Sequence, residues 1–204
     1  MPHPLHAPDG KTPLALVFDL DGTLADTMPA HFLAWTEVTR AAGLAFPEER
    51  FYAMGGVPTL TILRTLIEEQ GHGGDADELA ARKEAAFERH IPAAEPAAGV
   101  VAVLRSAQAA GLPCAVATGG NRATAAATLG AIGLAGDFPP GKVVAAEDTD
   151  RHKPHPAPYL LAAERLGVAP TGCDAYEDTD LGLESARAAG MRGIDVRRMR
   201  HAFA

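Results

Sequence analysis

The chain has 204 residues, of which 47% are hydrophobic and 22% charged, and a formal net charge of −8. This composition is ordinary for a globular protein. No basic run is available to neutralise phosphates, so neither nucleic acid nor an anionic membrane is expected as a partner. No stretch of about 18 apolar residues and no signal-peptide pattern occurs, which predicts a cytoplasmic protein. Residues 1–13 are proline-rich and are expected to form a flexible tail, with His3 and His6 as surface residues.

The first regular element is expected at residues 14–18, an apolar run that leads straight into Asp19. A run without polar alternation indicates a strand buried on both faces, as in a parallel sheet. Asp19 then falls at the carboxyl end of this strand, where open α/β sheets bind their ligands. Asp21 follows two residues later, and Gly22 permits a sharp turn. Two carboxylates this close repel each other unless a cation or proton lies between them, although a turn capped by aspartates is the simpler alternative.

The next block, residues 27–93, shows apolar residues at helical spacing and no convincing strand. Four helices are predicted here, over residues 29–42, 48–54, 59–70 and 77–90. Pro29 suits a first helical turn and Gly43 suits the end of that helix. The block therefore predicts a helical cap over residues 27–93, inserted into a core formed by residues 1–26 and 94–204.

From residue 97 onward, helices and strands alternate. Helices are predicted over residues 97–110, 122–132, 156–166 and 181–189, and strands over residues 114–117, 142–145, 173–176 and 192–196. This alternation implies right-handed crossovers and an α/β fold with a doubly wound parallel sheet. If Cys114 and Cys173 lie in strands on opposite sides of the first strand, they are about 9–10 Å apart. Because a disulfide spans at most about 7 Å, both cysteines are expected to be reduced core residues.

A glycine-rich turn follows the strand predicted over residues 114–117. Its polar and small residues are Thr118, Gly119, Gly120 and Asn121. Backbone N–H groups and a helix N-terminus at such a place favour a phosphate. A turn that merely caps the helix is the alternative.

Lys153 lies in a loop stiffened by neighbouring prolines, which commit its side chain to one direction. An isolated lysine is usually a solvated surface residue, but a buried ammonium near Asp19 would hold that carboxylate ionised. His152 and His155 flank the lysine and are expected to be loop residues, because two histidines without a third partner rarely bind metal.

Glu177 and Asp178 follow the strand predicted over residues 173–176, and Asp180 comes next at the start of a helix. Carboxylate oxygens are hard ligands, and Mg²⁺ normally takes one or two of them and completes its octahedron with water and phosphate. A charged loop with a helix cap at Asp180 is the alternative.

Four segments, residues 17–24, 117–121, 153–159 and 177–191, resemble in order the four motifs of the haloacid dehalogenase-like (HAD) phosphohydrolase superfamily. The resemblance implies a Rossmann-like core with an inserted α-helical cap. It also implies that Asp19 attacks phosphorus, that Asp21 is the general acid/base, and that Thr118 and Lys153 bind the phosphoryl group.

The same resemblance implies Mg²⁺ as cofactor, held by the Asp19 carboxylate, the Asp21 backbone carbonyl and Asp178, with Glu177 supporting its water shell. Positions expected to bind the substrate come from the cap and from the glycine-rich turn. They are Thr27, His31, Thr59, Lys83, Gly119, Gly120 and Asn121.

Within the superfamily, the chain is similar to the β-phosphoglucomutase-like subgroup and looks most like bacterial fructose-1-phosphate/6-phosphogluconate phosphatases. The resemblance implies hydrolysis of a small sugar phosphate through an aspartyl phosphate, by a monomer or weak dimer. A sugar-phosphate mutase is the first alternative, but the stretch around Thr59 lacks the Arg that grips a distal phosphate in mutases. An inactive ligand-binding member is the second alternative, although every catalytic position is filled.

Overall fold

The computed structural model describes residues 12–55 and 57–199. All but the last two residues of the tail expected at residues 1–13, including His3 and His6, therefore lie outside the described residues. The chain divides into two compact units. One comprises Met1–Asp26 with Glu95–Ala204, and the other comprises Thr27–Ala94.

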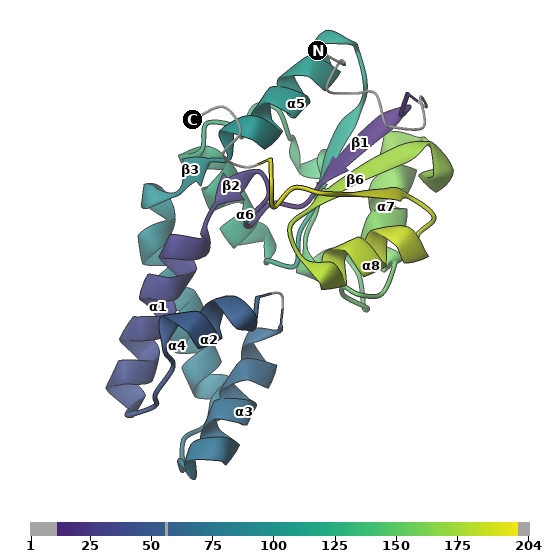
Figure 1. The fold of residues 1–204 in the computed structure, drawn as a ribbon. Helices are drawn as coiled ribbons and strands as arrows, with labels where there is room; N and C mark the ends of the chain where they lie inside the picture. Colours follow the sequence, from purple (N-terminus) through teal and green to yellow (C-terminus); the bar gives the residue numbers. More distant parts are fainter. Residues whose placement is uncertain (1–11, 56, 200–204) are drawn as a thin grey trace. The chain divides into compact units, whose positions relative to one another are not determined.

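The first unit is built on a five-stranded sheet in the order β5-β4-β1-β6-β7, in which all neighbours run parallel (Figure 1). The strands are β1 (Ala15–Phe18), β4 (Cys114–Ala117), β5 (Val143–Val144), β6 (Cys173–Glu177) and β7 (Arg192–Asp195). All four residues of β1 are buried, as its uninterrupted apolar run predicts. The strand expected over residues 142–145 comprises only Val143 and Val144. Lys142 belongs to the short helix η2 (Pro140–Lys142), and Ala145 caps the short helix that follows.

Helices cover both faces of this sheet. They are α5 (Ala98–Ala109), α6 (Arg122–Ala131), α7 (Ala157–Leu166) and α8 (Asp180–Ala188), joined by η3 (Ala146–Asp148) and η4 (Pro170–Gly172). On one face, Ala15 and Val17 share a buried cluster with Tyr159 and Ala162 of α7 and Ala186 of α8. Because successive side chains of a strand point to opposite faces, the other face is left to α5, which lies on the opposite side in Figure 1. The predicted doubly wound sheet is therefore confirmed.

The cysteines lie as expected. Cys114 begins β4 and Cys173 begins β6, on opposite sides of β1. Both are buried and free, and burial raises the pKa of each thiol to about 11. They are reduced core residues in this fold.

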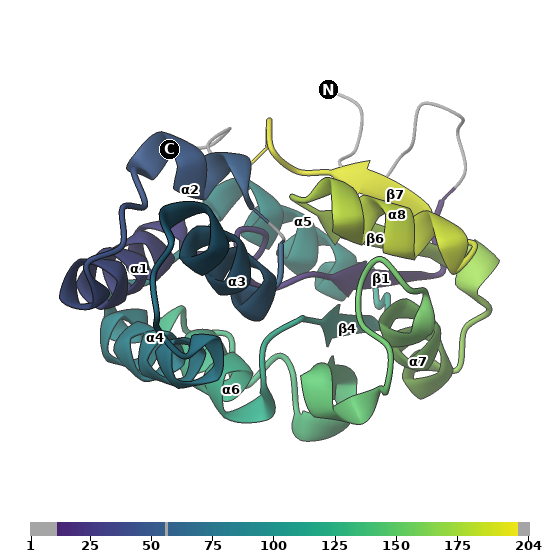
Figure 2. The ribbon, with the colours of Figure 1, turned by 90° about the horizontal axis from the view of Figure 1, so that it is seen from below.

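The regular elements described in the second unit are all helices. It consists of α1 (Met28–Ala42), α2 (Glu48–Ala53), α3 (Thr59–Gln70), α4 (Ala76–His90) and the short helix η1 (Ile91–Ala93). α1 and α4 lie side by side in both ribbon views (Figure 1, Figure 2). Trp35, Phe46 and Phe87 belong to its buried core, and the Trp35 and Phe46 rings meet edge to face with centroids 5.1 Å apart. Gly43 ends α1 at φ 73°, a left-handed conformation that glycine adopts without strain.

Two short strands that the sequence analysis did not predict lie where the chain leaves the first unit and where it returns to it. β2 (Ala25–Asp26) and β3 (Glu95–Pro96) pair antiparallel, and the N–H of Ala97 donates to the carbonyl of Leu24 at 2.9 Å. Strands of two residues show no hydrophobic alternation, which is why the pattern gave no sign of them.

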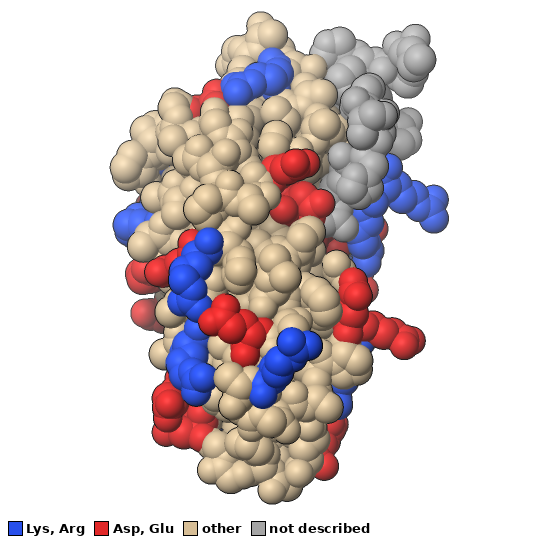
Figure 3. All heavy atoms as spheres, turned by 90° about the vertical axis from the view of Figure 1, so that its left-hand side faces the viewer, with Lys and Arg blue, Asp and Glu red and all other residues tan. Residues whose placement is uncertain are grey.

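Charged side chains are interspersed over the described surface. On the face drawn in Figure 3, Lys and Arg lie among Asp and Glu without a broad patch of one sign. Several basic side chains are paired, such as Arg89 with Glu37 and Arg50 with Glu69, both at 2.5 Å. Among the described helices, none has both the length and the apolar character needed to cross a bilayer.

Candidate active site

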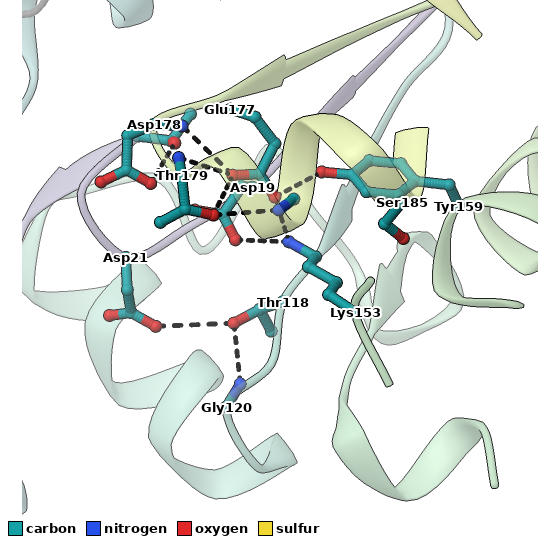
Figure 4. Close-up of polar contacts among 12 residues, drawn as sticks. Asp19, Asp21, Thr118, Gly120, Lys153, Tyr159, Glu177, Asp178, Thr179 and Ser185 are labelled. Carbon is teal, nitrogen blue, oxygen red and sulfur yellow. Dashed lines mark hydrogen bonds and ion pairs between the residues drawn. The ribbon is translucent and has the colours of Figure 1, made fainter. Parts of the chain in front are cut away.

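Polar residues from three strand ends and one loop converge at the carboxyl edge of the parallel sheet (Figure 4). Asp19 directly follows β1, Thr118 directly follows β4, and Glu177 is the last residue of β6. Lys153 comes from the loop between η3 and α7. The in-register pairing of β1 with β4 and β6 therefore brings together residues that are far apart in the sequence.

The Lys153 ammonium joins two carboxylates. Its Nζ lies 2.8 Å from Asp19 Oδ1 and 2.5 Å from Glu177 Oε1, and the three side chains are 13%, 9% and 1% exposed, respectively. Burial alone would lower the pKa of Lys153, but the charges of Asp19 and Glu177 outweigh it and raise that pKa well above its ordinary value. Lys153 is thus held as a buried cation.

The loop that carries Lys153 is fixed from α8. Ser185 Oγ donates to the carbonyl of His155 at 2.7 Å, and the Ala157 N–H donates to His155 Nδ1 at 3.2 Å. His155 is therefore a loop residue, as predicted, and its ring stabilises the start of α7.

Asp19 occupies an electrostatically demanding position. Burial raises the pKa of its carboxyl well above the usual range, Lys153 counteracts this, and the nearby charges of Glu177 and Asp178 raise it further. Among these four ionisable side chains, one ammonium faces three carboxylates, which leaves two negative charges uncompensated when all are ionised. An ionised Asp19 is therefore favoured by further positive charge at this edge.

Glu177 is already occupied by donors from the protein. Its Oε1 accepts from Lys153 and from the Tyr159 hydroxyl, the latter at 2.7 Å. Its Oε2 accepts from the Asp178 N–H at 3.1 Å, and from the Thr179 N–H and hydroxyl at 3.3 and 3.2 Å. These contacts make Glu177 a fixed internal anion that orients Lys153 and the following loop.

The donor set suits a divalent cation. Asp19, Glu177 and Asp178 each offer one carboxylate oxygen, and these atoms lie within 4.8 Å of one another. Hard oxygen ligands with one or two direct carboxylates are typical of Mg²⁺. Because Glu177 is committed to five protein donors, Asp19 and Asp178 are the carboxylates that fit direct coordination, and Glu177 fits a supporting position.

Two glycines make room for these carboxylates. A Cβ on Gly22, which has φ +82°, would lie 2.1 Å from Asp178 Oδ2, and a Cβ on Gly182 would lie 1.9 Å from Glu177 Oε1. Both distances are far below van der Waals contact, so the carboxyl groups fill the space that larger side chains would need.

The glycine-rich turn after β4 is ordered from within. Thr118 Oγ1 accepts from the Gly120 N–H at 3.0 Å and lies 3.5 Å from Asp21 Oδ2. Asn121 Oδ1 accepts from the Thr124 N–H at 2.8 Å, so this side chain caps α6. The first N–H of α6, on Arg122, donates to both oxygens of Glu147 at 3.0 Å. Thr118 and the backbone of Gly119 are consequently better suited to an incoming anion than Asn121 is.

The expected cap residues form a hydrogen-bonded chain within the second unit. Lys83 Nζ lies 3.1 Å from His31 Nδ1 and 3.1 Å from Glu84 Oε1, and the Thr59 hydroxyl donates to the same Glu84 oxygen at 3.2 Å. Thr27 is fully buried, and its hydroxyl has no hydrogen-bond partner among the described residues.

Two residues of these networks escaped the sequence analysis. Tyr159 lies on the buried face of α7, where its hydroxyl requires a partner, and that requirement is the only sequence signal of its contact with Glu177. Glu84 gave no signal, because a glutamate in a helix is normally a solvated residue.

A doubly wound sheet with a buried carboxylate–lysine pair and a cluster of acidic side chains at its carboxyl edge is typical of a Rossmann-like enzyme core, and the cluster could hold a metal ion. The chain matches the family model described as haloacid dehalogenase-like hydrolase over residues 14–190, and it belongs to that family.

Two relatives and one solved structure are similar to the chain over most of its length. It is 42% identical over 183 residues to the fructose-1-phosphate phosphatase YqaB of Escherichia coli K12, covering 89% of this chain and 95% of that one. It is 37% identical over 185 residues to the hexitol phosphatase A of the same organism, covering 88% and 81%. A HAD hydrolase of family IA, variant 3, from Entamoeba histolytica superposes with a TM-score of 0.79 at 25% identity, covering 90% and 83%. The names of both relatives agree with a phosphoric monoester hydrolase.

The close approach of Gly22 to Asp178 generates a stability prediction. We expect Gly22→Ala to lower the free energy of unfolding by about 2–4 kcal/mol, because positive-φ strain adds to overpacking against a carboxylate. Gly111→Ala is the matched control, since Gly111 has φ +73° and no atom within 4 Å of the added Cβ. It should cost only about 1 kcal/mol. Urea unfolding measures both, and equal losses would contradict the steric explanation.

Proposed function

We propose that the protein is a Mg²⁺-dependent phosphatase that hydrolyses small sugar phosphates through an aspartyl-phosphate intermediate on Asp19. The observation that carries the proposal is the 2.8 Å contact between Lys153 Nζ and Asp19 Oδ1, in a buried site that also contains Asp178. A carboxylate held beside a fixed ammonium is oriented for attack, and the same ammonium can neutralise phosphoryl oxygens.

The residues divide the reaction between them. An Asp19 oxygen forms the bond to phosphorus while the bond to the sugar oxygen breaks, and Asp21 gives that oxygen a proton. Asp21 then takes a proton from the water that attacks the aspartyl phosphate, which releases phosphate and restores Asp19. Thr118 and the backbone of Gly119 hold the phosphoryl oxygens. A bound Mg²⁺, held by Asp19 and Asp178, supplies Lewis-acid stabilisation of phosphoryl charge.

We assign two roles to residues 27–93. As a cap, they exclude bulk water from the reacting phosphoryl group and select the sugar. The chain enters this block at the β2 end and leaves it at the β3 end, so the paired strands are the natural pivot of a closing motion. His31 lies in the first turn of α1, which keeps it within a short length of chain from Asp21. With Thr27, Thr59 and Lys83 it is proposed to contact the sugar.

The similarity to a fructose-1-phosphate phosphatase and a hexitol phosphatase supports six-carbon sugar or sugar-alcohol monophosphates as the substrate class. The mutase alternative is disfavoured by Thr59, whose short hydroxyl cannot grip a distal phosphate as an arginine would.

Replacing the proposed nucleophile is the first test. Asp19→Asn should lower the rate of phosphate release at least about a hundredfold, because an amide is a poor nucleophile of nearly the same size. The fold should be retained. Asp150→Asn, the same exchange at an exposed position, is the control and should leave the rate unchanged. A few per cent of activity in fresh Asp19→Asn protein would mean that the nucleophile lies elsewhere.

Metal dependence is the second test. Activity should vanish after dialysis against EDTA and return with Mg²⁺. Ca²⁺ should inhibit, because its looser and larger coordination displaces Asp19 from the line of attack. Asp178→Asn should raise the Mg²⁺ concentration needed for half-maximal activity. Full activity in EDTA would refute the metal assignment.

Product analysis is the third test, and it separates the phosphatase from the mutase. A sugar monophosphate should release inorganic phosphate faster than it isomerises, because Thr59 cannot hold a distal phosphate in place and water reaches the phosphoenzyme once the sugar has left. Interconversion of β-glucose 1-phosphate and glucose 6-phosphate with little phosphate release would replace the phosphatase proposal with the mutase.

A further inference from the structure

The short helix η3 joins the two segments of the first unit that are proposed to hold the phosphoryl group. The Thr118 N–H donates to the carbonyl of Val144, just before η3, at 2.9 Å. The Ala146 N–H, at the start of η3, donates to the carbonyl of Gly120 at 2.9 Å. The loop that leaves η3 toward α7 carries Lys153, which lies with Thr118 at the carboxyl edge of the sheet (Figure 4). The separation of Thr118 and Lys153 therefore depends on where η3 lies.

Asp148, the last residue of η3, binds donors from three parts of this unit. Its Oδ2 accepts from the Ala145 N–H at 2.8 Å, and its Oδ1 accepts from Arg122 Nη2 at 2.7 Å and from Arg165 Nη2 at 2.9 Å. Its side chain is 11% exposed. Burial alone would raise the pKa of its carboxyl, but these hydrogen bonds outweigh it and lower that pKa to about 2. Asp148 is thus an anion at neutral pH that ties η3 to α6 and α7.

Arg165 extends this connection to the edge of the sheet. It lies in the last turn of α7, and its Nη1 donates to the carbonyl of Val143 in β5 at 2.6 Å. Its guanidinium therefore joins α7 to β5 and, through Asp148, to η3. The loop that carries Lys153 runs from η3 to α7, so the elements at both of its ends are held by Arg165.

We propose that Asp148 is a positioning residue that fixes η3 against α6 and α7 and thereby sets the separation of Thr118 and Lys153. This rests on the proposed function, which assigns both of those residues to the phosphoryl group. Asp148 acts through the backbone and does not touch the substrate. A displacement of about 1 Å between groups that bind one phosphoryl group is enough to cost about a hundredfold in rate.

The experiment measures Asp148→Asn, which nearly keeps the size of the side chain and removes its charge. A neutral amide binds two guanidinium groups more weakly than a carboxylate does. We expect kcat/KM for 4-nitrophenyl phosphate to fall at least about tenfold. The Kd of inorganic phosphate, measured by calorimetry in Mg²⁺, should rise at least about threefold, because its donors are no longer held at a fixed separation.

Asp137→Asn is the matched control for the loss of a charge pair. Asp137 lies in the same unit with its side chain 18% exposed, and it accepts from Arg105 and from Gln108 Nε2, the latter at 2.8 Å. This variant should lower Tm by a similar amount but leave kcat/KM and the Kd of inorganic phosphate nearly unchanged. Equal changes in the two variants, or an unchanged Kd in folded Asp148→Asn protein, would overturn the inference.

A milder exchange carries the test if Asp148→Asn does not fold. Arg165→Lys keeps the positive charge but loses the planar fork that reaches both Asp148 and the Val143 carbonyl. It should change kcat/KM and the Kd of inorganic phosphate in the same directions by about threefold. Arg105→Lys, the same exchange at the Asp137 pair, should change neither, and a wild-type Kd in Arg165→Lys protein would contradict the role of Asp148.

The proposed function has its own readout in the same measurements. If the wild-type protein neither hydrolyses 4-nitrophenyl phosphate nor binds inorganic phosphate in Mg²⁺, the phosphatase proposal itself fails. If it does both and Asp148→Asn behaves like Asp137→Asn, only the positioning role of Asp148 is refuted.

Discussion

The site depends on one buried ammonium shared by two carboxylates. Lys153 lies between Asp19 and Glu177, and its charge counteracts the rise that burial causes in the pKa of the Asp19 carboxyl. Glu177 in turn is saturated by Tyr159, Thr179 and the backbone of the acidic loop, so the position of Lys153 is tied to α7, to β6 and to the start of α8. Asp19 is thereby held by three segments distant in sequence, and its orientation is a property of the whole core.

The second unit repeats this arrangement in a different setting. Lys83 is again a buried ammonium with an adjacent carboxylate, but its other partner is a neutral imidazole instead of a second acid. In the core, acid exceeds base, which leaves room for a divalent cation. In the helical unit, the charges of Lys83 and Glu84 balance. The two buried lysines therefore sit in different electrostatic settings, one beside two carboxylates and the other beside one carboxylate and an imidazole.

Much of this arrangement is predictable from the sequence, because strand ends carry strong signals. The apolar run before Asp19 and the acidic pair after β6 gave the sheet and its carboxyl edge, and helix boundaries followed from Pro29 and Gly43. The hydrogen-bond networks between side chains gave no such signal. Tyr159 and Glu84 look like ordinary helix residues, and only three-dimensional packing brings Tyr159 to Glu177 and Glu84 to Thr59. Asn121 suits both a phosphate site and a helix cap, and its contact with the Thr124 N–H favours the cap.

Gly22 and Gly182 constrain how the acidic loop that carries Asp178 can change in evolution or be redesigned. Each marks the volume taken by a carboxyl group from another segment, Asp178 in the first case and Glu177 in the second. The acidic residues and the glycines are thus complementary shapes and cannot be exchanged independently. A metal-binding loop transplanted into a different sheet would need both glycines in the receiving backbone before its carboxylates could take up their positions. Loss of Glu177, conversely, would leave a small void beside Gly182 that a larger side chain could fill, whereas Gly22 would still be favoured by its φ of +82° after loss of Asp178.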